Sequence, residues 1–157
     1  MINIIDAYTE NHIPEIRNLF LEYAASLNID LCFQNFDKEL AGLPGDYAPP
    51  GGCLLMIIDG EKTAGCVAIR KISDEICEMK RLYIKPEFRG KGLGKKLAVT
   101  VIERAKNLRY HTMRLDTLPI MKEAIQMYRS LGFREISPYR FNPVEGAIYM
   151  ELELKGG

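Results

Sequence analysis

The stretch RGKGLG at residues 89–94 constrains the fold more than any other part of the sequence. It follows an apolar, strand-like run that ends at Ile84, and Pro86 stops that run before the glycines. A long helical pattern begins at the last glycine. The order strand, glycine-rich turn and helix places backbone N–H groups at a helix N-terminus, where partial positive charge accumulates. Glycines also let a phosphate approach the backbone closely. The stretch therefore predicts an anion-binding turn, although a plain structural turn has the same glycines.

Four cationic side chains surround this turn: Arg89, Lys91, Lys95 and Lys96. Lys95 and Lys96 fall in the first helical turn, where cations oppose the helix dipole. A helix built only for stability would more often carry Asp or Glu at those positions. The lysines thus favour a bound anion over a turn whose charges are merely solvated.

Two well-known phosphate motifs do not fit the stretch. A P-loop needs Ser or Thr after Gly-Lys to hold magnesium, whereas Lys96 follows Gly94 and Lys95 here. A dinucleotide fingerprint needs two residues between its second and third glycines, whereas only one residue separates Gly92 from Gly94. Neither of these two classes of phosphate site is therefore indicated.

The composition limits the classes of partner. The chain has 157 residues, which is a one-domain length, and we expect one domain over residues 1–157. Lys and Arg number 21, as do Asp and Glu, which argues against a general nucleic-acid binder, since such proteins are globally basic. No apolar run approaches the ~20 residues of a membrane span, and the first ten residues carry no signal-like segment. We expect a cytoplasmic protein with neither nucleic-acid nor membrane partners.

The cysteines and histidines do not suggest a metal site. Cys32, Cys53, Cys66 and Cys77 form no Cys-x-x-Cys pair, and three of them lie inside apolar runs. Buried free thiols in a reducing compartment are the expected outcome. The two histidines are isolated from one another and from the cysteines, so no metal is expected.

Hydrophobic periodicity predicts an alternation of strands and helices. We expect strands over residues 1–6, 53–58, 63–71, 76–84, 113–118, 133–137 and 147–154, and helices over residues 11–26, 36–43, 94–106 and 119–130. The irregular segment 28–52 contains Phe33 and Phe36, and long irregular segments often form binding walls. We predict that these two side chains bind the substrate; the alternative is a structural cover over the core.

The strand over residues 76–84 mixes charge with apolar groups on both faces. Simple alternation places Glu78, Lys80 and Leu82 on one face, with Met79, Arg81 and Tyr83 on the other. A strand between two neighbours normally avoids such charges. The charged side chains therefore need partners or a function.

The whole order of elements resembles the GNAT superfamily of N-acetyltransferases. Its most specific parts are KPEFRGKGLG at residues 85–94, similar to the family's cofactor motif, and AIQMYRSLGF at residues 124–133, similar to a later helix. The resemblance implies an α/β (α+β) fold of the GNAT type. That fold has a mixed, mostly antiparallel central sheet flanked by helices, and its central strands splay apart, here over residues 76–84 and 113–118.

The resemblance also implies acetyl-CoA as co-substrate, with no metal. The backbone of Leu82, Tyr83 and Ile84 would pair with the pantetheine arm, and the glycine turn would cradle the pyrophosphate. The turn residues implied in cofactor binding are Arg89, Gly90, Lys91, Gly92, Leu93, Gly94 and Lys95. One departure is visible: Met121 occupies a position where family members often have an Asn that contacts the pantetheine.

By the same resemblance, two side chains are candidates for catalysis. Tyr128 matches the family's usual general acid, which protonates the departing thiolate; the alternative is an ordinary core tyrosine. Glu78 lies where some members keep a base for the attacking amine; the alternatives are a substrate contact or a pairing with Lys80 or Arg81. A backbone N–H near Leu82 or Tyr83 would stabilise the oxyanion.

The expected function is transfer of an acetyl group from acetyl-CoA to a primary amine of a small molecule or peptide, by direct attack on the thioester. A non-catalytic acyl-CoA sensor with the same fold is the main alternative, and it would need to keep neither Glu78 nor Tyr128. A protein-interaction module gives no reason for the cationic turn. The acceptor amine stays open, and so does a homodimer.

Overall fold

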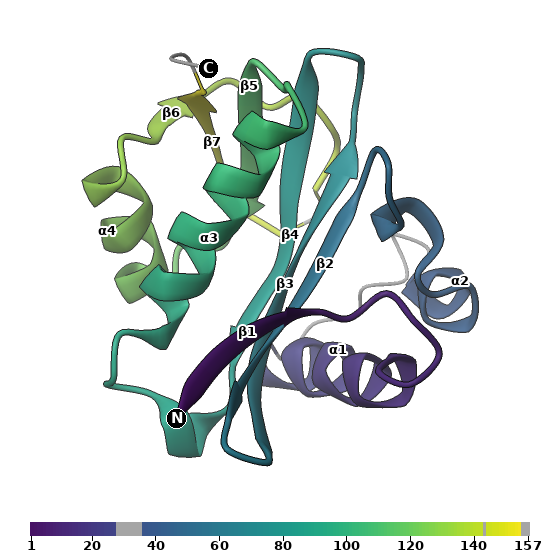
Figure 1. The fold of residues 1–157 in the computed structure, drawn as a ribbon. Coiled ribbons are helices and arrows are strands. Elements are labelled where there is room, and N and C mark those ends of the chain that lie inside the picture. The colour runs from purple at the N-terminus through teal and green to yellow at the C-terminus, as the bar shows by residue number, and fades with distance from the viewer. Residues whose placement is uncertain (28–35, 143, 155–157) are drawn as a thin grey trace.

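The computed structural model describes residues 1–27, 36–142 and 144–154. Its centre is a seven-stranded sheet in the order β1-β2-β3-β4-β5-β7-β6 (Figure 1). The strands are β1 (Ile2–Asp6), β2 (Cys53–Asp59), β3 (Lys62–Lys71), β4 (Ile76–Ile84), β5 (Thr112–Thr117), β6 (Arg134–Ile136) and β7 (Ile148–Glu153). All neighbouring strands pair antiparallel except β4 and β5, which run parallel. The predicted mixed, mostly antiparallel sheet is confirmed.

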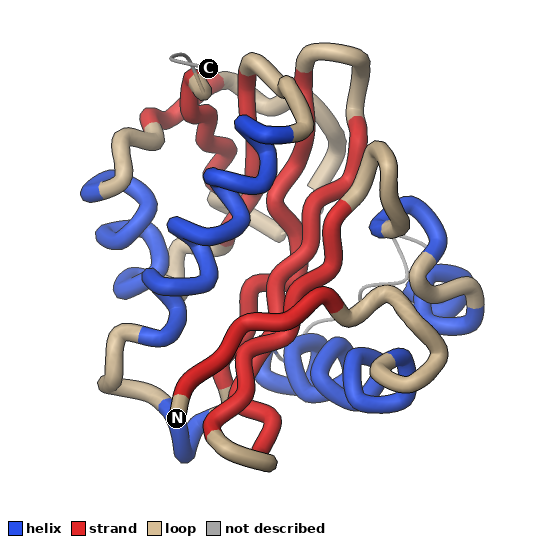
Figure 2. Tube along the Cα trace, in the orientation of Figure 1, coloured by secondary structure: helices blue, strands red, loops and turns tan. Residues whose placement is uncertain are grey.

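Helices cover both faces of the sheet (Figure 2). They are α1 (Ile13–Leu27), α2 (Phe36–Ala41), α3 (Leu93–Asn107) and α4 (Lys122–Ser130), with short 3₁₀ turns η2 (Gly45–Tyr47) and η3 (Pro86–Phe88). Helices α3 and α4 lie on one face and α1 and α2 on the other. None of the helices in the described part of the chain is long and apolar enough to cross a membrane.

Each face has its own buried cluster. On the side of α3, the apolar stripe Leu97, Val101 and Ala105 packs with Met113 and Leu115 of β5. On the side of α1, a second cluster joins that helix to the sheet, with Ile16, Phe20, Leu54, Met56, Cys66, Ala68 and Tyr83 among its members. The helical spacing of each stripe explains why these helices bury one side.

Several predicted boundaries move by a few residues. Helix α4 begins at Lys122 rather than at 119, because a turn in which Met121 N donates to Leu118 O precedes it. The strand expected over 133–137 is the short edge strand β6. The described cysteines, Cys53, Cys66 and Cys77, are free and buried as expected, and Cys32 lies outside the described residues.

The predicted alternation along β4 is wrong after Lys80. Cys66 pairs with Tyr83 and Ala68 pairs with Lys80, so two β4 residues oppose one β3 residue and form a β-bulge at Arg81. Arg81 has a φ of 60°, and its carbonyl accepts a hydrogen bond from Cys66 Sγ at 3.3 Å. The bulge places Arg81 on the same face as Lys80.

Strands β4 and β5 pair over a short length only. Their register runs from Ile76 with Thr112 to Glu78 with Arg114, although both strands continue beyond it. Residues of both strands past that point line a common cavity. The central strands therefore splay apart, as the resemblance implied, and the gap opens next to the β4 bulge.

Candidate active site

The glycine turn joins β4 to α3 as the sequence predicted. Gly92 is the N-cap of α3, with a φ of 75°, and Gly90 has a φ of 81°. A Cβ added at either glycine would meet nothing within 4 Å. The first turn of α3 has neither an acidic residue nor a side-chain cap. Open space in front of an uncapped helix N-terminus is well suited to an anion.

The cations around the turn are partly held in place by aromatic rings. Arg89 lies over Tyr83 at 5.7 Å, and its Nε donates to the carbonyl of Ile84 at 2.9 Å. Lys91 lies over Phe88 at 5.6 Å. The carbonyl of Ile84, expected to pair with the pantetheine arm, is thus already bonded to Arg89.

A cavity of about 40 Å³ occupies the gap between the splayed strands. It is lined by Tyr23, Met79, Lys80, Arg81, Leu82, Leu115, Asp116, Thr117, Met121 and Tyr128. Three residues singled out from the sequence, Leu82, Met121 and Tyr128, thus meet here. A larger hollow of about 1190 Å³ lies at the far end of β5, but it contains none of the expected site residues.

Tyr128 reaches the cavity from α4. Its side chain is 6 % exposed and packs edge-on against Phe133 at 5.6 Å. Burial raises the pKa of Tyr128 above its ordinary value, and the nearby Tyr23 and Asp116 add to the rise. The hydroxyl is protonated at neutral pH, as an ordinary tyrosine is, and the raised pKa makes it a weaker proton donor than a tyrosine in water.

Glu78 lies outside this cavity and is fully buried in a network of donors. Arg70 Nε donates to Oε1 at 2.8 Å, Tyr139 donates to Oε2 at 2.6 Å, and Arg140 Nη2 also contacts Oε2. Burial raises the pKa of Glu78, but the charges of Lys80, Arg140 and Arg70 and the hydrogen bond from Tyr139 outweigh it, so the pKa is lowered. Both oxygens are engaged, which leaves this carboxylate weakly basic.

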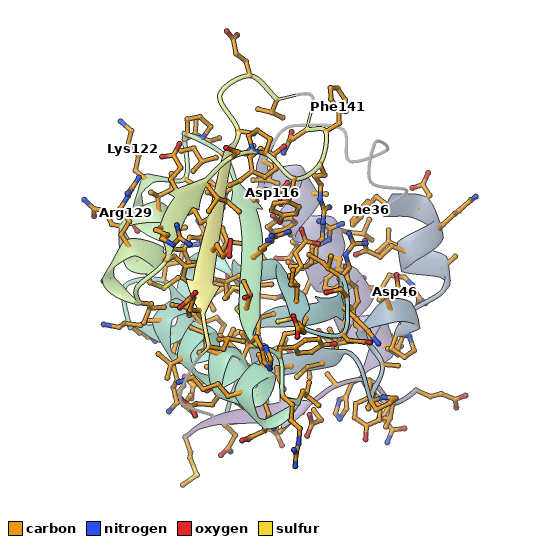
Figure 3. The ribbon with its side chains drawn as sticks, turned by 90° about the horizontal axis from the view of Figure 1, so that it is seen from above. Phe36, Asp46, Asp116, Lys122, Arg129 and Phe141 are labelled. Carbon is orange, nitrogen blue, oxygen red and sulfur yellow. The ribbon has the colours of Figure 1, made fainter. Side chains whose placement is uncertain are left out.

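Lys80 and Asp116 line the cavity but were not singled out as site residues from the sequence. Lys80 is 6 % exposed, and burial and the charge of Arg81 lower its pKa to about 8, although Glu78 counteracts the change. Asp116 accepts a hydrogen bond from Asn142 Nδ2 at 3.2 Å. Asp116 lies at the centre of Figure 3. Its position after the apolar Leu115 was the available signal, because alternation in β5 turns it away from α3.

The segment expected to bind the acceptor is only partly described. Phe33 lies outside the described residues. Phe36 is 7 % exposed, and the guanidinium of Arg81 lies over its ring at 5.3 Å. Phe36 therefore contacts the cavity wall through Arg81, and its role toward an acceptor stays a prediction.

A loop missed by the sequence analysis contributes more contacts. The segment 137–147 joins β6 to β7, and none of its residues was singled out from the sequence. Its Tyr139 and Arg140 reach Glu78 of β4, and its Asn142 reaches Asp116 of β5. Tyr149 of β7 holds the loop by donating to the carbonyl of Arg140 at 2.8 Å.

Comparisons with known proteins identify the family. The acetyltransferase (GNAT) family matches residues 13–133. An uncharacterized N-acetyltransferase of Schizosaccharomyces pombe is 41 % identical over 144 residues, which cover 90 % of this chain and 88 % of the relative.

Solved structures share the fold. A GNAT-family acetyltransferase from Staphylococcus aureus superimposes with a TM-score of 0.81 at 23 % identity, covering 99 % of this chain and 100 % of that one. An acetyltransferase from Salmonella typhimurium, solved with acetyl-CoA as its cofactor, has a TM-score of 0.71 at 18 % identity. The match covers 99 % of this chain and 95 % of that one. Since the family match spans more than half of the sequence and the yeast relative aligns along most of both chains, this protein belongs to the acetyltransferase (GNAT) family.

Proposed function

We propose that the protein is an acetyl-CoA-dependent N-acetyltransferase that acts on a primary amine of a small molecule or peptide. The observation that carries the proposal is the cavity between β4 and β5, which brings Tyr128 beside the bulged backbone of β4. The uncapped N-terminus of α3 begins at the end of the same strand. Because one sheet includes strands from β1 to β7, we treat residues 1–157 as one acetyltransferase domain.

Acetyl-CoA would supply an activated acetyl group, and the chain's own features suit it. The turn residues Arg89 to Lys95 offer N–H groups and positive charge to a pyrophosphate. The backbone of Leu82, Tyr83 and Ile84 would hold the pantetheine arm. Met121 lines the cavity and offers apolar contact where an Asn would offer hydrogen bonds. Most of the affinity therefore rests on backbone groups.

The bulge gives the reaction its electrostatic support. An extra residue in β4 leaves backbone groups near Leu82 without a regular ladder partner on β3. An N–H aimed into the cavity there would stabilise the oxyanion that forms when the amine attacks the thioester. Tyr128 lines the same cavity and would give the departing thiolate its proton.

Glu78 supports the site through its partners. Its two oxygens are bound by Arg70, Tyr139 and Arg140. Glu78 would therefore hold the loop between β6 and β7 against β4. Glu78 could act as a base for the amine or as a substrate contact, and these bound partners favour the contact role. A proton from the attacking amine would then leave through water or Asp116, which lines the cavity.

A panel of primary amines tests the proposal. Each amine is mixed with acetyl-CoA and protein, and the free thiol is followed together with the N-acetylated product. The alternative, an acyl-CoA sensor, predicts binding of acetyl-CoA without amine-dependent thiol release. The retention of Tyr128 in the cavity favours the enzyme.

A further inference from the structure

Two guanidinium groups lie against the ring of one tyrosine, Tyr139, in the loop between β6 and β7. Arg114 of β5 and Arg140 of the 137–147 loop lie over the ring of Tyr139, at 5.2 and 5.4 Å from its centre. Tyr139 is fixed in turn by its hydrogen bond to Glu78 and its edge contact with Tyr149. Two cations are therefore held close together on a rigid support.

These two cations are not equally satisfied. Arg140 contacts the buried carboxylate of Glu78. Arg114 is paired with Glu151, but the 3.8 Å from its Nε to Oε2 is beyond hydrogen-bond distance. Its Nε is buried and has no hydrogen-bond partner among the described residues. Buried donors nearly always have an acceptor, so Arg114 is the less satisfied of the two cations.

Both arginine side chains are partly exposed. The Arg114 side chain is 26 % exposed and that of Arg140 is 20 % exposed. Cations in this region also disfavour one another: Arg140 is among the charges that lower the pKa of Lys80. A ligand that brings a negative charge here would relieve that repulsion.

A negatively charged side chain, Asp116, lies two residues after Arg114 in β5. Met113 and Leu115 face the α3 cluster, so alternation places Arg114 and Asp116 together on the opposite face, about 7 Å apart. Asp116 lines the cavity that holds Tyr128. A cationic group would thus be drawn toward the reacting centre and an anionic group toward Arg114.

Resting on the proposed function, we propose that the acceptor is an amino acid or a similar zwitterion. Its carboxylate is bound by Arg114 and Arg140, and its amino group is directed into the cavity by Asp116. This assignment makes Arg114 and Arg140 specificity-determining residues, with Tyr139 as the ring that supports both. It also explains why three side chains of one loop reach acidic residues on two different strands.

Matched substrates test the proposal in the unmodified protein. Each standard L-amino acid is compared with its own carboxamide, which keeps the amine and side chain but removes the negative charge. For the accepted side chains, kcat/KM should favour the acid by ~10–100-fold, the worth of a charge-assisted hydrogen bond. Equal or better use of the amides would overturn the proposal.

Variants locate the preference. Arg114→Met and Arg140→Met should each reduce the acid-to-amide ratio about tenfold or more, mainly through KM, while acetyl-CoA affinity stays unchanged. Arg114→Lys keeps the charge and should retain part of the ratio. Arg129→Met is the matched control, because Arg129 lies on the surface at the end of α4, paired with Glu135 at 3.6 Å. A full acid preference in folded Arg114→Met and Arg140→Met would contradict the assignment.

Two further results distinguish a failure of the zwitterion proposal from a failure of the proposed acetyltransferase function. Asp116→Asn should raise KM for acid and amide alike, because both carry the ammonium group. If KM for both substrates stays unchanged in this variant, the role of Asp116 is wrong. If thiol is released only with amines that lack a carboxylate, the proposal of a zwitterionic acceptor is wrong. If no amine causes thiol release, the proposed acetyltransferase function itself is wrong.

Discussion

Arg81 and Glu39 form a two-pronged ion pair that joins the β4 bulge to α2. Arg81 Nε donates to Oε2 at 2.9 Å and Nη2 donates to Oε1 at 2.7 Å. The Arg81 side chain is 3 % exposed and that of Glu39 is 16 % exposed. Rings of Tyr23 and Phe36 flank the guanidinium at 5.8 and 5.3 Å. The helix α2 therefore holds the bulge that shapes the cavity.

Glu39→Gln should destabilise the protein by about 3 kcal/mol, because it leaves the buried Arg81 charge without its partner. For a chain of this size the loss corresponds to a fall in Tm of roughly 6–12 °C. Thermal unfolding monitored by circular dichroism measures it. Glu135→Gln, which breaks the exposed pair with Arg129, is the control and should change stability by no more than about 0.5 kcal/mol. Equal effects would show that the Arg81 pair does not anchor the bulge.

Gly92→Val should weaken acetyl-CoA binding at least about tenfold, because a branched side chain would fill the open space before α3. The substitution also strains a positive φ, so the control is Gly60→Val in the β2–β3 hairpin. Gly60 has a φ of 64° and the same open surroundings. Calorimetry with acetyl-CoA should show normal affinity in the Gly60 variant. Normal affinity in a folded Gly92 variant would remove the phosphate role of the turn.

Lys80 gives stability a defined pH dependence. Its pKa falls from 10.5 to about 8 on folding, so between these values the unfolded chain binds more protons than the folded one, and this residue makes stability rise with pH. Below pH 8 the destabilisation caused by burying the charged Lys80 is fully present, at about 3 kcal/mol. Lys80→Met should therefore be more stable than wild type at pH 7, with the difference shrinking between pH 8 and 10.5. Urea unfolding across that range measures it, and a constant difference would contradict the shift.

Much of the fold was predictable because its signals are local. The glycine turn, the amphipathic stripe of α3 and the alternation in β5 each depend on residues close in sequence. The motif at residues 124–133 likewise identified Tyr128, which the structure places at the cavity.

The missed features depend on contacts between distant residues. The bulge at Arg81 arises from pairing with β3, where a side chain at Gly65 would clash with the carbonyl of Tyr83. The loop at 137–147 lies far from β4 in sequence, so its contacts with Glu78 could not be read from spacing. Neither the burial of Glu78 nor that of Lys80 follows from their residue types, since charged residues are usually exposed.

Tyr128→Phe keeps the ring and its contact with Phe133 but removes the hydroxyl. It should lower kcat by ~10²–10⁴, the usual contribution of a placed acid, with little change in acetyl-CoA affinity. Tyr110→Phe is the matched control: Tyr110 is also buried, but it donates to the carbonyl of Gly51 away from the cavity. A less than threefold fall in kcat for the Tyr128 variant would make it a packing residue.

The central claim is that the protein transfers acetyl groups to amines. The most direct measurement mixes wild-type protein, acetyl-CoA and the amine panel, and quantifies N-acetylated products by mass spectrometry and free CoA thiol in the same samples. The account predicts at least one amine for which product and thiol appear in equal amounts, and only when protein is present. Tight binding of acetyl-CoA by calorimetry with no product from any amine would contradict it and identify an acyl-CoA sensor instead.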